Sequence, residues 1–250
     1  MDLKSLLKLI SETAKQNGIR EPYVVGGIPR DLFMGNTGQL NDIDLTNGEA
    51  SISKLADLMA AKLQVQPKIL ADGHKKLRFE RFTLDFSTNE IYSNADTLLN
   101  SIGITHIDDL VRETYCRDFT INTLLLPLDF NKILDLTAKG KKDISDKIIR
   151  CPLDPVITIK ASPNRIIRAF YYAAKYKFKI DDELKRAISL NLDLLQHVKE
   201  KYASDKISEA ISLDPKILDE LVESGVMHKI RLTKDITDAL VKSRKLTEVL

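Results

Sequence analysis

The chain has 250 residues, of which 43% are hydrophobic, and its 38 basic and 36 acidic side chains leave a formal net charge of +2 at pH 7. This length and apolar content are enough for one large packed domain or two small ones. No run of about 18 apolar residues is present, so we expect no membrane-spanning segment.

The two cysteines, Cys116 and Cys151, lack metal-ligand spacing, and the four histidines are scattered along the chain. A zinc site or a histidine-based phosphohydrolase centre is therefore not expected. Residues 1–4 do not resemble the start of a secretory signal. Together these features predict a cytoplasmic protein with reduced thiols.

The first predicted element is an amphipathic helix within residues 1–20, whose apolar stripe ends before Asn17-Gly18. Strand and helix patterns then alternate up to residue 136. In this stretch we predict strands at 23–25, 42–46, 65–70, 75–79 and 82–87, and helices at 29–34 and 52–63. Residues 1–136 are therefore predicted to form an α/β head domain with a mixed β-sheet.

The pattern becomes helical from about residue 137. We predict helices at 163–178, 182–196, 204–212, 214–224 and 233–249. Residues 137–250 are thus predicted to form a helical neck and a short helical C-terminal part. Residues 139–168 contain 8 Lys or Arg and 3 Asp or Glu, a local net charge of +5, which is typical of an RNA track but also of a Lys-rich surface loop.

A double glycine follows the first predicted strand. Gly26 and Gly27 can adopt positive φ and let the backbone approach a ligand closely. Pro29 suits the first turn of a helix, where its missing N–H has no cost. A helix N-terminus at this point would attract a phosphate group, to which Arg30 could add a charge-assisted hydrogen bond.

Two carboxylates occur in the next predicted strand, at Asp42 and Asp44. Residues two apart in a strand point to the same face, so both carboxylates project together while Ile43 faces the core. Mg²⁺ prefers one or two carboxylates together with substrate phosphates. A double glycine or an Asp-x-Asp pair alone is more often structural, but the two in this order favour a nucleotidyltransferase site.

A further acid, Asp85, alternates with Leu84 and Phe86 in the strand predicted at 82–87. It is our candidate for a third catalytic carboxylate, and a surface carboxylate of the strand is an equally good interpretation.

Three more motifs support a resemblance to a known family. Cys116–Leu124 reads CRDFTINTL, which is similar to the RRDFTINAL motif of class II tRNA nucleotidyltransferases (CCA-adding enzymes) and bacterial poly(A) polymerases. The stretch from Leu134 to Arg150 resembles the link between head and neck in that family. Asn164–Phe170 resembles its RILRA helix. On these motifs, residues 23–180 are identified as resembling the head and neck domains of the family.

The resemblance implies a polymerase-β-like nucleotidyltransferase fold, followed by an all-helical neck and a truncated body. It implies a template-independent enzyme that adds nucleotides to RNA 3′ ends, with CTP and ATP as substrates and two Mg²⁺ ions held by Asp42 and Asp44. The residues implied to bind the nucleotide are Gly26, Gly27, Arg30, Arg117, Asp118, Asn122, Ser162, Arg165 and Arg168. For Asp118 the alternative is a helix N-cap, with Arg117 as its surface neighbour.

The chain departs from the family pattern at several positions. Cys116 replaces the first arginine of the RRDFT motif, Pro29 a valine, and Tyr171 a third arginine of the RILRA helix. In the motif EDxxR, Ala161 and Ser162 replace the acidic pair, while the arginine is kept. In CCA-adding members this motif hydrogen-bonds the Watson–Crick edge of the incoming base. The replacement therefore puts strict selection of C and then A in doubt.

The predicted helix at 163–178 has two faces. Its apolar stripe includes Ile166 and Phe170, and Arg165, Arg168 and Tyr172 lie on another face. A basic stripe with an aromatic ring could hold a nucleotide base, whereas a solvated charged face is the better interpretation for Lys175.

Several functions follow from these observations as hypotheses. We favour CCA addition or repair at a tRNA 3′ end, followed by poly(A) or oligo(A) addition to RNA 3′ ends. A non-catalytic RNA- or nucleotide-binding module is an alternative from another class, and nucleotidyl transfer to a small molecule or protein is a further one. About 70 residues follow the RILRA-like helix, so we expect the tRNA-gripping body of CCA-adding relatives to be missing or much reduced. We therefore expect the protein to bind a smaller substrate, to use a partner protein or to form a homodimer.

Overall fold

The computed structural model describes residues 1–36, 38, 40–70, 73–88 and 92–242. The chain divides into two compact units, Met1–Ile144 and Ser145–Leu250, which we call the head and the helical unit. The division lies eight residues beyond the boundary predicted after residue 136. Residues 137–144 pack with the head because Thr120 Oγ1 donates a 2.7 Å hydrogen bond to the buried carboxylate of Asp143.

The head contains a six-stranded mixed sheet in the order β3-β4-β5-β2-β1-β6. Strands β2 and β5 are parallel, and the other neighbouring pairs are antiparallel. The mixed sheet of the sequence-based prediction is therefore confirmed. The strands are β1 (Tyr23–Val25), β2 (Asp42–Thr46), β3 (Lys68–Ile69), β4 (Lys75–Phe79), β5 (Phe82–Phe86) and β6 (Leu126–Pro127).

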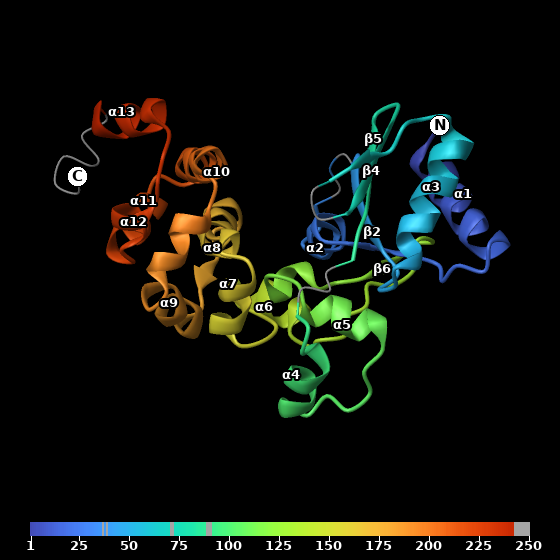
Figure 1. Ribbon diagram of the computed structural model, residues 1–250, viewed down its shortest axis with the longest axis horizontal. Coiled ribbons are helices and arrows are strands. Elements are labelled where there is room, and N and C mark those ends of the chain that lie inside the picture. Colours follow the sequence, from blue (N-terminus) through green and yellow to red (C-terminus); the bar gives the residue numbers. More distant parts are fainter. Residues whose placement is uncertain (37, 39, 71–72, 89–91, 243–250) are drawn as a thin grey trace. The chain divides into compact units, whose positions relative to one another are not determined.

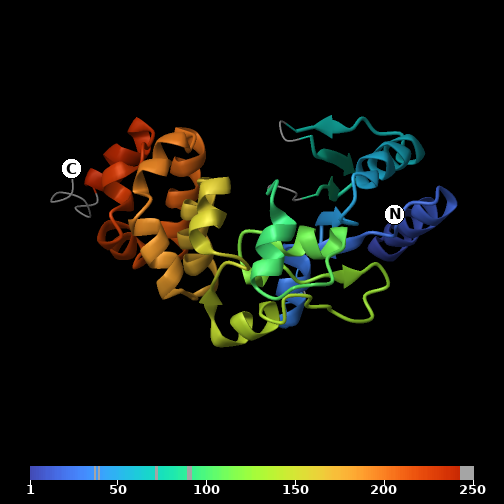
Figure 2. The same ribbon diagram turned by 60° about the horizontal axis from the view of Figure 1, so that its bottom comes forward.

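Two helices, α1 (Leu3–Gln16) and α3 (Ser51–Leu63), lie side by side against the sheet (Figures 1 and 2). Helix α1 begins at Asp2, whose carboxylate accepts a hydrogen bond from the Ser5 N–H. The apolar stripe of α1 is buried as predicted and shares one core with α3 and the sheet. The other head elements are α2 (Gly27–Phe33), α4 (Ala95–Ser101), α5 (Asp109–Tyr115) and the 3₁₀ turn η1 (Thr120–Asn122).

Helix α2 begins two residues before the predicted start, because Gly26, with φ +72°, already turns the chain out of β1. Strand β3 covers only residues 68–69 of the predicted 65–70. The chain just before it caps α3 instead: Gln64 has φ +55°, and the Val65 N–H donates to the Ala60 carbonyl.

The helical unit is built mainly from helices, and α8 contributes more buried hydrophobic side chains than any other of its described helices. Its helices are α7 (Pro155–Ala161), α8 (Asn164–Tyr176), α9 (Asp182–Ser189), α10 (Glu200–Leu213), α11 (Ile217–Glu223), α12 (Val226–Lys229) and α13 (Lys234–Lys242), with a 3₁₀ helix η2 (Leu192–His197). Helix α6 (Gly140–Asp146) spans the division between the units. A short parallel pair, β7 (Ile148–Ile149) and β8 (Lys179–Ile180), was not predicted and means that the neck is not entirely helical.

The helix predicted at 182–196 is divided into α9 and η2. Asn191 ends α9 because its side-chain N–H₂ group donates a 2.8 Å hydrogen bond to the Ala187 carbonyl. The helix predicted at 233–249 is described only to Lys242, and its remaining residues lie outside the described part of the chain. Among the described residues, no helix has both the length and the apolar content needed to cross a membrane.

Candidate active site

Three aspartates lie together on neighbouring strands. In β2 the side chains of Ile43 and Leu45 are buried, while Asp42 and Asp44 point to the opposite face, as predicted. Strand β5 runs parallel to β2 in a register that places Asp85 beside Asp44. The polar face of these central strands therefore carries three carboxylates.

Asp44 has the most perturbed environment of the three. Burial raises the pKa of Asp44, the positive charge of Arg117 opposes this rise, and the negative charge of Asp85 adds to it. Asp85 is paired with Lys76 of β4 at 3.1 Å, through only one of its carboxylate oxygens. Its other oxygen, Oδ1, is buried and has no hydrogen-bond partner.

Gly26 is required for the carboxylate of Asp44 to lie where it does. In the antiparallel register of β1 and β2, Val25 is opposite Asp44, so the chain turns immediately beside this carboxylate. A Cβ atom on Gly26 would lie 2.9 Å from Asp44 Oδ2 and 3.9 Å from Arg117 Nη1. The backbone at Gly26, with φ +72° and ψ −117°, is also one that only glycine adopts readily.

Arg30, Asp118 and Asn122, three of the predicted nucleotide-binding residues, form one buried network. The Arg30 guanidinium donates to the Asn122 side-chain oxygen, and the Asn122 amide donates to Asp118 Oδ1 at 2.9 Å. Asp118 Oδ1 also accepts from the Phe119 N–H. The network joins α2 to η1. The N-cap of η1 is Phe119 rather than Asp118, and Arg117 is buried, so the alternative of a helix cap with a surface neighbour does not hold.

Glu113 of α5, which holds Arg117, was not predicted as a site residue. Glu113 is completely buried, and its Oε1 accepts a 2.6 Å hydrogen bond from Arg117 Nη2. The spacing of four residues was the available signal, because it is the spacing of ion pairs on a helix face. Nε of Arg117 is buried without a hydrogen-bond partner, so the guanidinium is fixed in place with one donor unused.

We expect the substitution Glu113→Gln to destabilise the head by about 3–5 kcal/mol, because it leaves the buried Arg117 charge without its counter-ion. The matched control is Glu12→Gln, which breaks the exposed pair between Lys8 and Glu12, also four residues apart. That change should cost no more than about 0.5 kcal/mol. Denaturant unfolding of both variants tests this, and equal small losses would contradict the assignment of a buried ion pair.

The carboxylates fit a divalent cation only in part. Among the described residues, no group of three or more His, Cys, Asp or Glu side chains is arranged to hold a metal ion by itself. The unsatisfied Oδ1 of Asp85 and the raised pKa of Asp44 nevertheless mark carboxylate oxygens that a cation would stabilise. This donor set suits Mg²⁺, which completes its shell with water and substrate phosphates.

Ser162, Arg165 and Arg168 belong to the helical unit. Ser162 follows the end of α7 in extended conformation, and its carbonyl accepts a 2.9 Å hydrogen bond from the Arg165 N–H. Arg165 is buried, so it is not part of a solvated charged face. Arg168 is half-buried, and its guanidinium contacts Tyr172.

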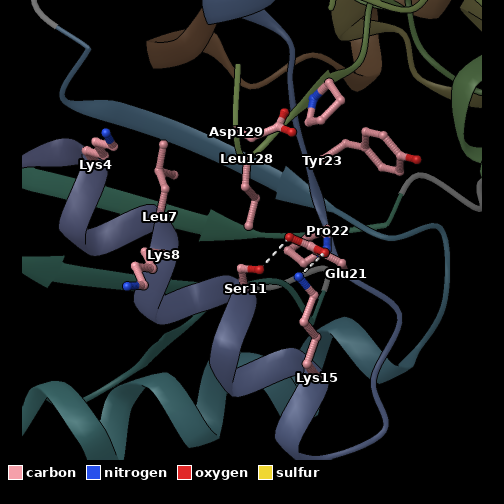
Figure 3. A pocket seen from close by; sticks show the side chains of 11 residues that line it. Lys4, Leu7, Lys8, Ser11, Lys15, Glu21, Pro22, Tyr23, Leu128 and Asp129 are labelled. Atoms are coloured by element: carbon pink, nitrogen blue, oxygen red, sulfur yellow. Dashed lines mark hydrogen bonds and ion pairs between the residues drawn. The ribbon is translucent and has the colours of Figure 1, made fainter. Parts of the chain in front are cut away.

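Both cysteines are buried, and neither forms a disulfide. A cavity of about 410 Å³ lies between α1 and the segments next to β1 and β6 (Figure 3). Lysines of α1 surround it, and Glu21 accepts a hydrogen bond from Ser11 and pairs with Lys15 there. None of the predicted site residues lines this cavity.

Comparison with known proteins places the chain in a family. Residues 22–150 match the family model of the poly A polymerase head domain. The chain is 32% identical over 230 residues to tRNA nucleotidyltransferase cca2 of Schizosaccharomyces pombe, which covers 84% of the chain and 46% of that protein. It is 26% identical over 237 residues to the CCA-adding enzyme of Geobacillus sp., covering 90% of the chain and 54% of that protein. The chain thus spans about half the length of the curated relatives it matches.

The fold is also that of a solved tRNA-processing enzyme in its apo form. The two structures superpose with a TM-score of 0.70 at 23% identity, covering 98% of this chain and 63% of the other. The residues of this chain that match the head-domain model include the double glycine, the paired aspartates of β2 and the RDFTIN segment. The chain belongs to the class II tRNA nucleotidyltransferase and bacterial poly(A) polymerase family.

Proposed function

We propose that the chain is an RNA 3′-end nucleotidyltransferase, which adds C and A to a tRNA 3′ end from CTP and ATP. The observation that carries this proposal is the pair Asp42 and Asp44 on the open face of β2, with Asp85 beside Asp44. Like charges this close are unfavourable unless a cation lies between them. A chain that did not use them would gain stability by losing them.

We infer that Asp42 and Asp44, with Asp85 beside them, hold two Mg²⁺ ions. When bound, the ions would lower the pKa of the attacking 3′-hydroxyl and neutralise charge on the triphosphate. Every other part of the catalysis falls to the protein, which must bind the triphosphate, orient it and keep it away from water.

Arg117 is the proposed triphosphate ligand nearest to the carboxylates. The buried Glu113 fixes its guanidinium, and the unused Nε–H can donate to a phosphate oxygen. Gly26 leaves room for this approach because it has no Cβ atom between Asp44 and Arg117. Gly27, which opens α2, is the second proposed contact of the backbone with the triphosphate.

We propose that Arg30, Asp118 and Asn122 contact the ribose and phosphates of the incoming nucleotide. Their hydrogen bonds to one another fix their rotamers before the nucleotide binds. Binding then requires little reorganisation, which is the condition for catalysis by positioning. From the helical unit, Ser162, Arg165 and Arg168 are the proposed contacts to the base.

Addition of A alone, as poly(A) or oligo(A), is the second candidate. The observation that favours it is the replacement of the acidic pair of EDxxR by Ala161 and Ser162. A serine hydroxyl both donates and accepts hydrogen bonds, so it discriminates less between bases than a carboxylate does. The intact Arg165 keeps tRNA end synthesis ahead.

Nucleotide incorporation by the purified protein with Mg²⁺ tests the proposal. Each labelled triphosphate is supplied singly and in combination, with a tRNA that ends before its CCA and with an unstructured RNA. We expect C, C and A to be added only to the tRNA. Addition of A alone to either RNA would support the second candidate, and no incorporation under any condition would leave an RNA- or nucleotide-binding module.

A further inference from the structure

The aromatic residues of the helical unit are concentrated on two helices. The chain has seven tyrosines and no tryptophan. Four of these tyrosines, Tyr171, Tyr172, Tyr176 and Tyr202, lie on α8 and α10. The two helices pack against each other (Figure 1). We use the name tyrosine face for these four residues together with Arg168, Lys175 and Lys206.

The rings form a continuous series along α8. Tyr172 and Tyr176 are stacked, with centroids 6.1 Å apart and an interplanar angle of 18°. Tyr171 is tilted against Tyr172 at 5.3 Å. Tyr171 is buried, whereas Tyr172, Tyr176 and Tyr202 are half-buried and keep part of their surface open to solvent. Rings needed only for packing would be covered, so the exposed part of the series is available to a ligand.

Cations flank the rings on both helices. The Arg168 guanidinium lies 5.1 Å from the ring centre of Tyr172 and donates a 3.0 Å hydrogen bond to its hydroxyl. Lys175 Nζ lies 5.5 Å from the centre of the Tyr176 ring. From α10, Lys206 Nζ lies 4.2 Å above the Tyr171 ring.

The tyrosine face carries three cations, Arg168, Lys175 and Lys206. One carboxylate that contacts it is Glu209, which accepts hydrogen bonds from the Tyr171 hydroxyl at 3.0 Å and from Lys206 at 2.7 Å. The hydrogen bond from Lys206 keeps the pKa of Glu209 low, so this acid is charged at neutral pH and offsets one of the three cations. Lys175 is exposed beside the rings and can meet an anionic partner.

Half-exposed rings at stacking distance beside cations are what single-stranded nucleic acid requires, because each base has a flat face and each phosphate a charge. We propose that the tyrosine face binds the single-stranded end of an RNA, with bases stacked on Tyr172 and Tyr176 and phosphates near Lys175. The choice of RNA rests on the proposed function, but the binding itself needs neither triphosphate nor Mg²⁺.

The test is equilibrium binding of the whole chain to a labelled single-stranded RNA of about ten nucleotides, a length within the usual site sizes for such surfaces. Fluorescence anisotropy without triphosphate or Mg²⁺ gives the dissociation constant. We expect Tyr172→Ala and Tyr176→Ala to weaken binding by roughly 5- to 150-fold each. Tyr176→Phe, which keeps the ring, should bind like the unmodified protein.

The absence of tryptophan provides an independent readout. Tyrosine emission is not masked by tryptophan, and four of the seven tyrosines lie on the tyrosine face. Unlabelled RNA should therefore quench the emission, and the quenching should be smaller in Tyr176→Ala than loss of one tyrosine alone would explain.

The exposed side chain of Lys175 provides a second test if the alanine variants fold poorly. Lys175→Gln changes an exposed position and should lower the slope of log K against log salt by about 0.7, the value for one phosphate contact on a single strand. The matched control is Lys185→Gln on α9, outside the tyrosine face, which should leave the slope unchanged.

The outcomes separate this proposal from the proposed function. If Asp44→Asn binds the RNA normally while Tyr172→Ala and Tyr176→Ala do not, the tyrosine face is an RNA-binding surface whatever the incorporation assay shows. If folded Tyr172→Ala and Tyr176→Ala bind as well as the unmodified protein, the proposal is wrong even if incorporation is normal. Equal binding of single-stranded and duplex RNA, with no effect of the alanine changes, would also overturn it.

Discussion

Asp44→Asn is expected to abolish nucleotide incorporation while making the protein more stable. Loss of a carboxylate that holds a catalytic metal removes several kcal/mol of transition-state stabilisation, so we expect a fall of at least about 10³-fold. The amide has the same shape as the carboxylate and preserves the packing of β2. The incorporation assay measures the loss, and Asp193→Asn, at an exposed carboxylate of the helical unit, is the matched control.

The gain in stability has a defined pH dependence. Burial raises the pKa of Asp44 in the folded head above its value of about 3.9 in an unfolded chain. Between these two pKa values the folded state binds more protons, so the free energy of unfolding falls as the pH rises. Asp44→Asn removes the loss of stability that the buried, charged carboxylate causes at neutral pH.

Thermal unfolding at two pH values tests the expected gain in stability of Asp44→Asn. At pH 7 we expect the variant to melt higher than the unmodified protein, by roughly 2–4 °C for each kcal/mol relieved. Below about pH 4 the carboxyl is protonated in both states and the difference should disappear. A variant that incorporates nucleotides within tenfold of the unmodified rate, or one that melts lower at pH 7, would contradict the assignment of a strained catalytic carboxylate.

Gly26→Ala is expected to have the second large effect, through two separate causes. The backbone conformation of Gly26 is nearly restricted to glycine, and forcing another residue into it costs about 1–3 kcal/mol. The new Cβ atom would also lie 2.9 Å from Asp44 Oδ2, so the carboxylate must move. Because small displacements of catalytic groups are costly, we expect incorporation to fall by about 10²-fold or more.

Gly18→Ala separates the two causes. Gly18 also has a positive φ, of +63°, but a Cβ atom there would have nothing within 4 Å. This control should lose about 1 kcal/mol of stability and keep its activity. Denaturant unfolding and nucleotide incorporation, measured on both alanine variants, separate the effect on the backbone from the effect on the carboxylate. If both alanine variants are equally active, the space beside Asp44 has no role in the reaction.

The elements that could be predicted from the sequence are those with a local cause. The β-branched run ending at Gly26 gave β1 with its observed bounds, and alternation gave β2 together with the direction of both aspartates. The apolar stripe of α1 likewise depends on nearby residues only. In each of these cases the pattern and the packing agree.

Other features depend on residues far apart in the chain. Helix α5 was not predicted, although Asp108 caps it by accepting a hydrogen bond from the Val111 N–H, because seven residues are too few to show a clear helical period. Glu113 therefore had no assigned surroundings. The sequence alone also does not show that Arg30 and Asn122, 92 residues apart, are hydrogen-bonded to each other.

The arrangement of the three aspartates depends partly on local sequence and partly on the pairing of strands in the folded sheet. The spacing of Asp42 and Asp44 within one strand is local and was predicted. That Asp85 lies beside Asp44 depends on the parallel register of β2 and β5, which is a property of the folded sheet. The sequence therefore left Asp85 undecided between a catalytic acid and a surface carboxylate, and the register places it beside Asp44.

The two outer strands of the head sheet are each only two residues long. An open sheet edge offers unpaired backbone groups to any extended chain, and long edges invite edge-to-edge aggregation. Strand β3 presents Lys68 at its edge, and β6 contains Pro127, which has no N–H group to donate. The head is therefore built so that its sheet does not extend into a neighbouring molecule, and strands exposed during synthesis meet few pairing sites on finished copies of the protein.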